Sequence, residues 1–534
     1  METHFNTLGI MIDMSRNAVM SVDGLKKYLC IIKQFGYNTV MLYTEDTYEI
    51  DGEPFFGYMR GRYSKLEMKE IDSFAESIGV TIIPCIQTLA HLKTFLRWNK
   101  VSVDCNDIML TDDERTYELI DKMFKTMSEC FKSRKIHIGM DEAHMLGRGK
   151  HLDIYGYEKT DIIMQRHLNR VLKLAEKYGY EAMMWSDMFF RSWNDGHYHA
   201  PVGAIPQAII DSFPQNVIPV YWDYYLIDEQ GYSEMLENHK LLSNRSWFAG
   251  GAWTWYGITP FNKFTLKSMC PAIDACKKHN VKDIFFTMWG DDGGECSRFA
   301  ILPALYYLAE YSKGNTDIGK IKEGFKRIMG IDYDDFIKLD LPNDIVEYTK
   351  LPKNPAKYML YSDYFNGFLD YTAPRNVSDK YEQYANELFA IAKKSSKYGY
   401  LFDTQAKLCM LLKVKFELGL KTREAYEKND KKELLRLVEV EYNDTIKGFK
   451  SFGRAIEKQW LRENKSQGLE IQHQRIGAMI YRTKFCRQRL LDYVNGKIQK
   501  IDELEEKLLP YGKKEMGGSY NKALFFSTAN VVVH

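Results

Sequence analysis

The sequence predicts an α/β fold, with a (β/α)₈ TIM barrel followed by a C-terminal all-helical domain. Eight short apolar runs alternate with longer amphipathic stretches over about the first 315 residues. Eight strand–helix repeats are the number that closes such a barrel. Beyond that point the strand-like runs stop and charged amphipathic stretches take over. We therefore expect a barrel over 1–315 and a helical domain over 316–534.

The eight runs are apolar nearly throughout, which is typical of parallel strands buried on both faces. A doubly wound open sheet is the competing arrangement, but no G-x-G-x-x-G turn follows the first run. The predicted strands cover residues 8–14, 37–43, 80–87, 135–140, 181–187, 217–224, 246–253 and 283–289.

Helical stretches separate most of these runs, and their ends carry capping residues. Ser21 or Asp23 can cap the first helix at its N-terminus. Gly36 and Gly179 stand where C-terminal caps belong. These signals support the alternation of strands and helices.

The C-terminal part has apolar residues at spacings of three and four, the pattern of amphipathic helices. We expect these long helices to be structural, with homodimer formation as a second role. The chain ends in a short apolar tail, "ALFFSTANVVVH" (523–534). Such a tail is expected to pack on the body of the protein or on a second subunit.

Composition excludes several classes of function. The formal net charge is +1, which gives no electrostatic reason to expect nucleic acid or an anionic membrane as a partner. No run approaches the roughly 18 apolar residues of a membrane span. The nine cysteines are scattered without a C-x-x-C pair, which favours reduced thiols over disulfides or a zinc site. Since the N-terminus also lacks a signal-peptide pattern, we expect a cytoplasmic protein.

Polar and aromatic residues gather where the predicted strands end. In barrels of this kind the functional site lies at those carboxyl ends. Carboxylates, one arginine and several tryptophans and tyrosines there suit a sugar pocket, although any one tryptophan could instead cap the core and Arg16 could simply pair with Asp13. The residues are Asp13, Ser15, Arg16, Gln87, His91, Asp141, Glu142, Trp185, Asp187, Tyr221, Trp222, Asp223, Tyr224, Trp253, Trp255, Tyr256, Trp289 and Asp291.

The stretch "HIGMDEAHMLG" (137–147) places two carboxylates side by side at the end of the fourth run. Asp141 shares the inward parity of His137, because neighbours on a strand point to opposite faces. Glu142 follows at the turn and can lean over the same pocket. Adjacent carboxylates raise each other's proton affinity, so one member of the pair is expected to stay protonated near neutral pH and act as a general acid.

These motifs resemble glycoside hydrolase family 20, the β-N-acetylhexosaminidases. "IHIGMDE" is similar to the family's H-x-G-G-D-E signature, with Met140 in place of the second glycine. Asp13 and Arg16 match its D-x-x-R, and "TMWGDD" resembles its W-x-E. His91 stands at the family's P-G-H histidine, whereas Gln87 replaces a more usual acidic residue. A barrel followed by a helical domain looks like the intracellular bacterial N-acetylglucosaminidases of this family.

The resemblance implies a retaining, exo-acting enzyme without cofactor or metal. In such enzymes the substrate's own 2-acetamido oxygen attacks the anomeric carbon and forms an oxazolinium ion. Carried over, Glu142 is general acid and then base, and Asp141 accepts a hydrogen bond from the acetamido N–H. Tyr256 donates to the acetamido oxygen, with Tyr221 and Tyr224 as alternatives. The remaining implied substrate contacts are Arg16, His91, Trp185, Tyr221, Trp253, Trp255, Trp289 and Asp291.

Two other functions stay open from sequence: a non-catalytic amino-sugar-binding barrel and a metal-dependent amidohydrolase built on the rim histidines and aspartates. The expected partner is a small oligosaccharide or glycan that ends in an N-acetylhexosamine. The sequence does not separate GlcNAc from GalNAc, which differ at one hydroxyl.

Overall fold

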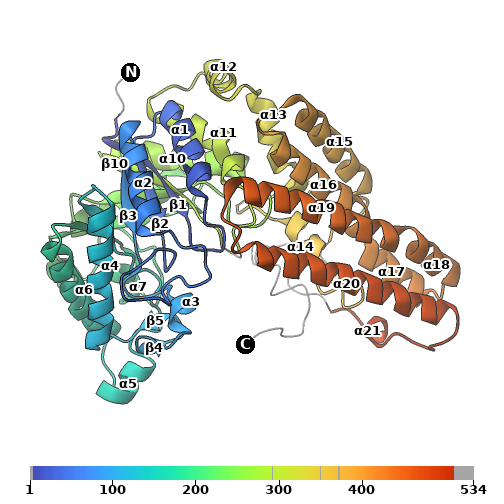
Figure 1. Cartoon of the computed structure of the whole chain (residues 1–534), viewed down its shortest axis with the longest axis horizontal. Coiled ribbons are helices and arrows are strands. Elements are labelled where there is room, and N and C mark those ends of the chain that lie inside the picture. Colours follow the sequence, from blue (N-terminus) through green and yellow to red (C-terminus); the bar gives the residue numbers. More distant parts are fainter. Residues whose placement is uncertain (1–3, 292, 349, 371–372, 510–534) are drawn as a thin grey trace. The chain divides into compact units, whose positions relative to one another are not determined.

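The computed structural model describes residues 4–291, 293–348, 350–370 and 373–509. Its first part is a closed barrel of eight parallel strands, as the alternation of apolar runs predicted (Figure 1). The order around the barrel is β1-β10-β9-β8-β7-β6-β3-β2. The strands are β1 Thr7–Asp13, β2 Thr39–Tyr43, β3 Thr81–Cys85, β6 Lys135–His137, β7 Glu181–Trp185, β8 Val217–Trp222, β9 Trp247–Gly251 and β10 Asp283–Met288.

Helices follow the barrel strands, and a small hairpin of β4 (Val103–Cys105) and β5 (Ile108–Met109) is inserted after β3. Ser21 caps α1, because its side chain accepts a hydrogen bond from the Gly24 N–H. Gly36 ends α1 with φ 103°, a left-handed conformation that glycine adopts without strain. The helices are α1 Val22–Phe35, α2 Lys65–Ser77, α3 Lys93–Leu96, α4 Glu114–Cys130, α5 Lys150–Tyr155, α6 Thr160–Lys177, α7 Asp187–Arg191, α8 Gln207–Ser212, α9 Glu229–Leu242, α10 Asn262–Lys278, η1 Arg298–Ile301 and α11 Leu302–Ser312.

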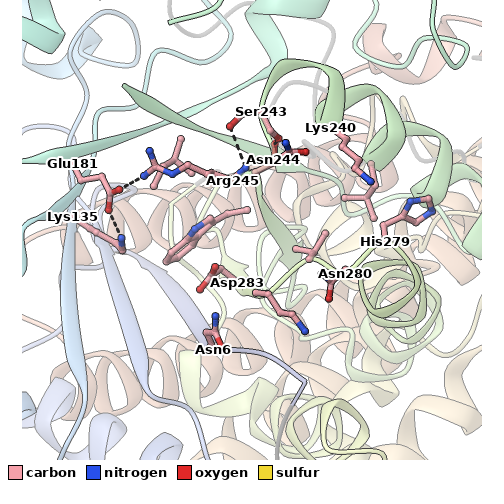
Figure 2. Close-up of a pocket in the computed structure, with 16 residues that line it drawn as sticks. Asn6, Lys135, Glu181, Lys240, Ser243, Asn244, Arg245, His279, Asn280 and Asp283 are labelled. Atoms are coloured by element: carbon pink, nitrogen blue, oxygen red, sulfur yellow. Dashed lines mark hydrogen bonds and ion pairs between the residues drawn. The ribbon is translucent and has the colours of Figure 1, made fainter. Parts of the chain in front are cut away.

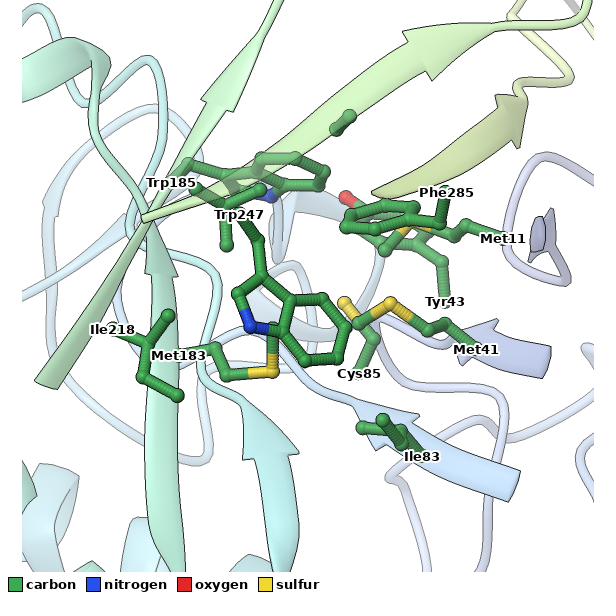
Figure 3. Close-up of a cluster of buried hydrophobic side chains, with 12 residues drawn as sticks. Met11, Met41, Tyr43, Ile83, Cys85, Met183, Trp185, Ile218, Trp247 and Phe285 are labelled. Carbon is green, nitrogen blue, oxygen red and sulfur yellow. The ribbon is translucent and has the colours of Figure 1, made fainter. Parts of the chain in front are cut away.

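The barrel interior is filled by side chains at alternate positions of β2, β3, β7, β8 and β9, together with one residue each from β1 and β10 (Figure 3). On β8, Ile218 and Val220 point inward, and Trp222 packs against the same cluster from the rim. The barrel is therefore a packed core rather than a channel, and substrates can be met only at its ends. The cluster comprises Met11, Met41, Tyr43, Ile83, Cys85, Met183, Trp185, Ile218, Val220, Trp247, Ala249 and Phe285.

The remaining chain is largely helical, as predicted. By its internal contacts the chain divides into two compact units, and the second holds 253–264, 291–303 and 322–534. The first two of these segments follow β9 and β10 in the chain. The helices from residue 318 on are α12 Ile318–Met329, α13 Tyr333–Ile337, η2 Lys338–Asn343, α14 Pro355–Tyr361, α15 Ser378–Lys394, α16 Gly399–Lys415, α17 Leu418–Glu427, α18 Lys431–Glu439, α19 Glu441–Glu463, α20 Leu469–Val494 and α21 Asp502–Glu505.

Three further sequence predictions concern the cysteines, membrane-spanning helices and the apolar tail. All nine cysteines carry free thiols, as expected from their scattered positions. Among the described helices, none combines the length and apolar character needed to cross a membrane. The apolar tail 523–534 lies outside the described residues.

Candidate active site

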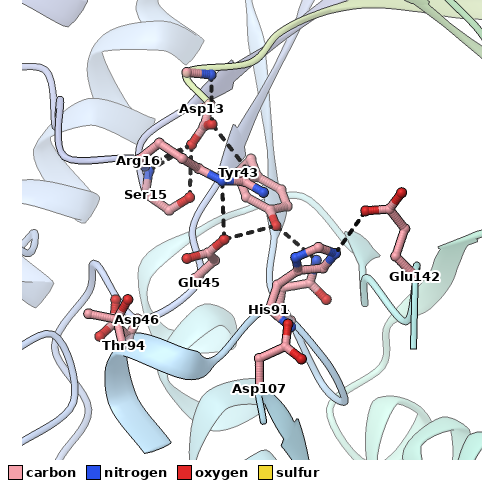
Figure 4. Close-up of polar contacts among 12 residues, drawn as sticks. Asp13, Ser15, Arg16, Tyr43, Glu45, Asp46, His91, Thr94, Asp107 and Glu142 are labelled. Carbon is pink, nitrogen blue, oxygen red and sulfur yellow. Dashed lines mark hydrogen bonds and ion pairs between the residues drawn. The ribbon is translucent and has the colours of Figure 1, made fainter. Parts of the chain in front are cut away.

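Asp13 and Arg16 form the first part of the rim, at the end of β1 (Figure 4). Asp13 is buried, and its Oδ1 accepts hydrogen bonds from the Ser15 N–H and hydroxyl at 2.8 Å. Its Oδ2 lies 3.1 Å from Arg16 Nη1 and accepts from the Gly290 N–H at 2.9 Å. Asp13 thus fixes both the turn after β1 and the arginine.

Glu45 is the second carboxylate that holds Arg16. The Nε atom of Arg16 lies 3.4 Å from Glu45 Oε1, and the Tyr43 hydroxyl donates to the same oxygen at 3.3 Å. Burial raises the pKa of Glu45, although the charges of Arg16 and His91 oppose the rise. Glu45 is not among the residues predicted from the sequence, which include none at the end of β2. The carboxyl-end rule that selected the other rim residues would have found it.

Asp141 is held from two sides. Gln87 Nε2 donates to Asp141 Oδ1 at 2.9 Å, and His91 Nε2 lies 3.1 Å from Oδ2. Gln87 itself fits only because residue 139 is glycine, since a Cβ there would lie 2.0 Å from the Gln87 Oε1 atom. Gln87, which replaces the acidic residue more usual in the family, is therefore a hydrogen-bond donor to Asp141.

The peptide around the pair is strained. Met140 and Glu142 have φ values of 73° and 50°, and His91 has 59°. Left-handed backbone costs a non-glycine residue about 1–3 kcal/mol and is concentrated at functional sites. Glycine in the family's signature suits this conformation at position 140. Met140 is fully buried, so its side chain offers no surface to a pocket.

Glu142 differs from Asp141 in exposure. Its side chain is 43% exposed, and Glu142 Oε2 lies 3.8 Å from His91 Nε2. Its main-chain N–H donates to Asp187 Oδ2 at 3.2 Å, and Arg191 Nε donates to the same oxygen at 3.1 Å. Asp187 therefore anchors the backbone of Glu142 and leaves its carboxylate free to approach a ligand.

The charges of these groups are set by burial and by each other. Burial alone would raise the pKa of Asp141, but the charge of His91 and the hydrogen bonds from His91 and Gln87 lower it to about 2. Burial alone would lower the pKa of His91, but Asp141 raises it to about 9. Burial raises the pKa of Asp187 to about 7, and the charge of Asp141 adds to this rise. Asp141 is thus ionised and faces a protonated histidine.

His137 belongs to the layer beneath the pair. It is fully buried, and its Nδ1 accepts from the Gly139 N–H at 3.1 Å. Burial lowers its pKa to about 3, so the ring is neutral. This arrangement favours a hydrogen-bonded structural residue over a catalytic one.

Trp289 and Trp185 were predicted as pocket walls. Trp289 is partly buried, lies edge-on to Tyr43 with ring centroids 4.7 Å apart, and has the Arg16 guanidinium 5.2 Å from its ring. Trp185 is only 1% exposed and belongs to the inner cluster, where it contacts His137. Trp289 therefore presents a surface at the rim, whereas Trp185 offers a substrate almost none.

Tyr221 lies within β8 and Tyr224 follows its end, and the two have different surroundings. Tyr221 is fully buried, its ring lies 4.7 Å from His239 of α9, and its hydroxyl donates to Asp223 at 3.1 Å. It faces the helix layer, because β8 sends Ile218 and Val220 inward. Tyr224 stacks on Trp222 with centroids 5.4 Å apart. Tyr221 thus offers no exposed surface for the substrate contact that the sequence suggested.

Trp253, Trp255 and Tyr256 lie in the second unit and form one aromatic cluster there. Trp253 and Trp255 are stacked with centroids 4.4 Å apart, and Tyr256 meets Trp253 edge-on at 4.7 Å. Asn354 Nδ2 donates to the Tyr256 carbonyl oxygen. Asp291 begins the other short segment of this unit. Their roles toward a substrate stay predictions.

Two further features bear on the chemistry. His91, Asp141 and Glu142 offer ligand atoms within 4.8 Å of one another, a spacing that could hold a metal ion.

A hollow of about 730 Å³ lies at the other end of the barrel, where Lys135, Glu181 and Asp283 begin their strands (Figure 2). Because it is at the amino ends of the strands, this hollow is separate from the acid pair.

Two mammalian hexosaminidases are similar to part of this chain. Human hexosaminidase D is 23% identical over 235 residues, which cover 42% of this chain and 46% of the relative. Bovine hexosaminidase D is 24% identical over 254 residues, covering 45% and 68%. The chain thus spans about half the length of the human relative.

Two solved structures are among those similar to this chain. An exo β-N-acetylglucosaminidase from Vibrio harveyi, in complex with N-acetylglucosamine, is 15% identical with a TM-score of 0.48, covering 63% of this chain and 59% of that one. A β-N-acetylhexosaminidase from Bacteroides fragilis is 18% identical with a TM-score of 0.47, covering 61% and 72%.

Two family models match in tandem. The catalytic domain of glycosyl hydrolase family 20 matches residues 5–223, and the Glycoside Hydrolase 20C C-terminal domain matches residues 334–522. The barrel strands β9 and β10 lie beyond the first match and complete the same closed sheet. The order of the two models along the chain agrees with a barrel followed by helices, and the chain belongs to glycoside hydrolase family 20.

Proposed function

We propose that this protein is an exo-acting β-N-acetylhexosaminidase that releases terminal GlcNAc or GalNAc with retention of configuration. The observation that carries the proposal is that two adjacent carboxylates have different environments. Asp141 is buried, ionised and clamped by Gln87 and His91. Glu142 is half exposed, with its backbone held by Asp187 and its carboxylate 3.8 Å from His91 Nε2.

The reaction needs one fixed negative charge and one group that exchanges a proton. In the first step the acetamido oxygen of the substrate bonds to the anomeric carbon while the glycosidic C–O bond breaks. Glu142 donates its proton to the departing oxygen. Asp141 accepts a hydrogen bond from the acetamido N–H and stabilises the positive charge of the oxazolinium ion. Water then attacks the anomeric carbon, Glu142 takes its proton, and the original configuration is restored.

Arg16 and its two carboxylates suit the hydroxyl groups of the terminal sugar. Arg16 is 23% exposed in its side chain, and Asp13 and Glu45 fix its direction. Trp289 adds an aromatic face beside it. A pocket closed by such hydroxyl binders accepts a chain end, which supports exo cleavage. Tyr256 as donor to the acetamido oxygen rests on the sequence resemblance.

A metal-dependent hydrolase is the second candidate, favoured by the spacing of His91, Asp141 and Glu142. Activity that survives dialysis against a chelator would eliminate this candidate.

The proposed activity is tested with p-nitrophenyl β-glycosides of GlcNAc and GalNAc. We expect nitrophenol release from at least one of them, a β-configured sugar as the first product by NMR, and competitive inhibition by a GlcNAc thiazoline that mimics the oxazolinium ion. Tight GlcNAc binding in calorimetry without any turnover would instead identify a sugar-binding protein.

Glu142→Gln should remove the general acid. We expect turnover of alkyl or sugar glycosides to fall by two to four orders of magnitude, because a poor leaving group needs the proton. Activated aryl glycosides should lose much less in the first step. Steady-state kinetics on both substrate types measure this, with the exposed Glu118→Gln as the control for the same chemical change. Equal losses on both types would remove Glu142 from this role.

Asp141→Asn should abolish assistance by the acetamido group. We expect a loss in kcat/KM of about 10²–10³, the usual size for one electrostatic stabiliser, together with a loss of affinity for the thiazoline. Asp153→Asn, an exposed aspartate on α5, is the control. Full activity of Asp141→Asn would contradict substrate assistance.

The His91–Asp141 pair should make stability depend on pH. Because the pKa of His91 is raised from 6.5 to about 9, its stabilisation is complete below pH 6.5 and is lost as the pH rises through 9. The contribution at pH 6 is on the order of 3 kcal/mol. The melting-temperature gap between wild type and His91→Gln should therefore narrow from pH 6 to pH 10. As a control, His91→Gln introduced into the Asp141→Asn variant should give a melting-temperature difference that does not narrow with pH. If the difference between wild type and His91→Gln stays constant with pH, the His91–Asp141 ion pair is refuted.

A further inference from the structure

The hollow at the amino ends of the barrel strands is a second candidate binding site (Figure 2). Its volume of about 730 Å³ is within the range of small-molecule sites. Its lining residues all belong to the barrel unit. A neighbouring hollow of about 560 Å³ shares Asn6, Lys135, Glu181 and Trp247 with it. The two hollows therefore adjoin on the amino face of the barrel.

Cationic side chains gather in this hollow from the chain segments that lead into β6, β9 and β10. Among the described lining residues, these cations outnumber the carboxylates by four to two. Such an excess of positive charge in a concave surface attracts anions, because the walls focus the electric field. The cations are Lys135, Lys240, Arg245 and Lys282, and the carboxylates are Glu181 and Asp283.

Glu181 cannot neutralise the cations on its side of the hollow. Lys135 and Arg245 both pair with this one carboxylate, each with a different oxygen. In Figure 2 this group of three lies on one side of the hollow, and Lys240 and His279 lie on the other. The shared carboxylate therefore leaves one positive charge in excess on its own side.

The second carboxylate does not neutralise the remaining lysines either. Asp283 Oδ1 accepts a hydrogen bond from the Thr7 hydroxyl at 2.5 Å. Lys282 Nζ lies 3.5 Å from the His4 carbonyl oxygen. In the part of the chain that the structure describes, neither Lys240 nor Lys282 has a carboxylate oxygen within 4.0 Å. These two ammonium groups are thus able to pair with a ligand.

His279 reports the same positive surroundings. Burial lowers its pKa, and the charges of Lys278 and Lys240 lower it further against the opposing charge of Glu237. Its Nε2 atom is buried and has no hydrogen-bond partner among the described residues. An anion in the hollow would offset this excess of positive charge.

The uncharged lining combines an apolar floor with amide side chains. Ile218 and Trp247 belong to the cluster that fills the barrel. The amides of Asn6, Asn244 and Asn280 can both donate hydrogen bonds to hydroxyl groups and accept them. This mixture suits an anionic group carried on a body with several hydroxyl groups.

We propose that this hollow binds a phosphorylated small molecule with hydroxyl groups, of the sugar phosphate class. A phosphate monoester carries about −1.5 to −2 charges near pH 7, which matches the excess of cations in the lining. Lys240 and Lys282 attract the phosphate, and the asparagines bind the hydroxyl groups. Because the hollow is at the opposite end of the barrel from the acid pair, this ligand does not compete with a substrate there.

Calorimetric titration of the full chain with glucose 6-phosphate tests the site. We expect binding that weakens as KCl is raised from about 0.05 to about 0.5 M, because salt screens the attraction between charges. Glucose should bind at least about tenfold more weakly, because it has no anionic group. Inorganic phosphate should also bind about tenfold more weakly, because it has no hydroxyl-bearing body for the asparagines.

Two substitutions locate the binding site. Lys240→Gln and Lys282→Gln should each weaken the binding of glucose 6-phosphate by about tenfold and leave hydrolysis of the nitrophenyl glycosides unchanged. Neither lysine is buried, so the melting temperatures should stay close to that of the wild type. Lys69→Gln, which changes an exposed lysine of α2 outside the hollow, is the matched control and should leave the affinity unchanged.

Failure of the wild-type protein to bind glucose 6-phosphate, or full affinity in both lysine variants, would overturn the proposal. An equal loss in Lys69→Gln would also overturn it, because the effect would then follow from total charge. Equal affinities for glucose 6-phosphate and inorganic phosphate would overturn the assignment to a sugar phosphate. The titrations do not depend on turnover, so the site and the proposed hydrolase activity are tested separately.

Discussion

Pairing of β1 with β10 is the constraint on which the rest of the barrel depends. These strands lie about 270 residues apart in the chain, yet six of their residues pair in register from Thr7 with Asp283 to Ile12 with Met288. The closure brings Gly290 within hydrogen-bonding distance of Asp13. It also sets Trp289 beside Arg16. Without it, the carboxyl ends of the eight strands would form an open edge and not a ring.

The rim of the closed barrel carries several carboxylates that are buried from water, among them Asp13, Glu45 and Asp141. Burying an ionised carboxylate is costly unless charges or hydrogen bonds compensate it. Arg16 compensates Asp13 and Glu45, and His91 with Gln87 compensates Asp141. The contacts that lower the cost of burying these charges also fix the directions of the charged side chains. Stability and the proposed catalysis therefore depend on the same few polar contacts.

The second unit holds its two short segments by buried polar contacts of a similar kind. Gln405 of α16 donates to the Ile258 carbonyl at 3.0 Å and accepts from the Thr259 hydroxyl at 2.9 Å. Glu295 is buried between Lys357 and Arg475, at 2.8 and 2.6 Å. These contacts explain why segments that follow barrel strands in the chain are grouped with the helices. Strand-like runs alone cannot reveal this grouping, because the partners lie between 62 and 180 residues away in the chain.

The sequence by itself determined the eight strands, their order of appearance, the helical region that follows, and the positions of Asp141, Glu142 and Arg16 at strand ends. These features follow from local patterns, because a parallel strand that is buried on both faces has an uninterrupted run of apolar residues. Tertiary structure decided which rim residues meet. Parity along β8 turned Tyr221 toward α9, depth in the barrel buried Trp185, and Glu45 and Gln87 became partners of Arg16 and Asp141. Which face of a strand turns inward, how deeply a side chain is buried and which groups compensate its charge depend on neighbours from distant strands, and no local pattern encodes them.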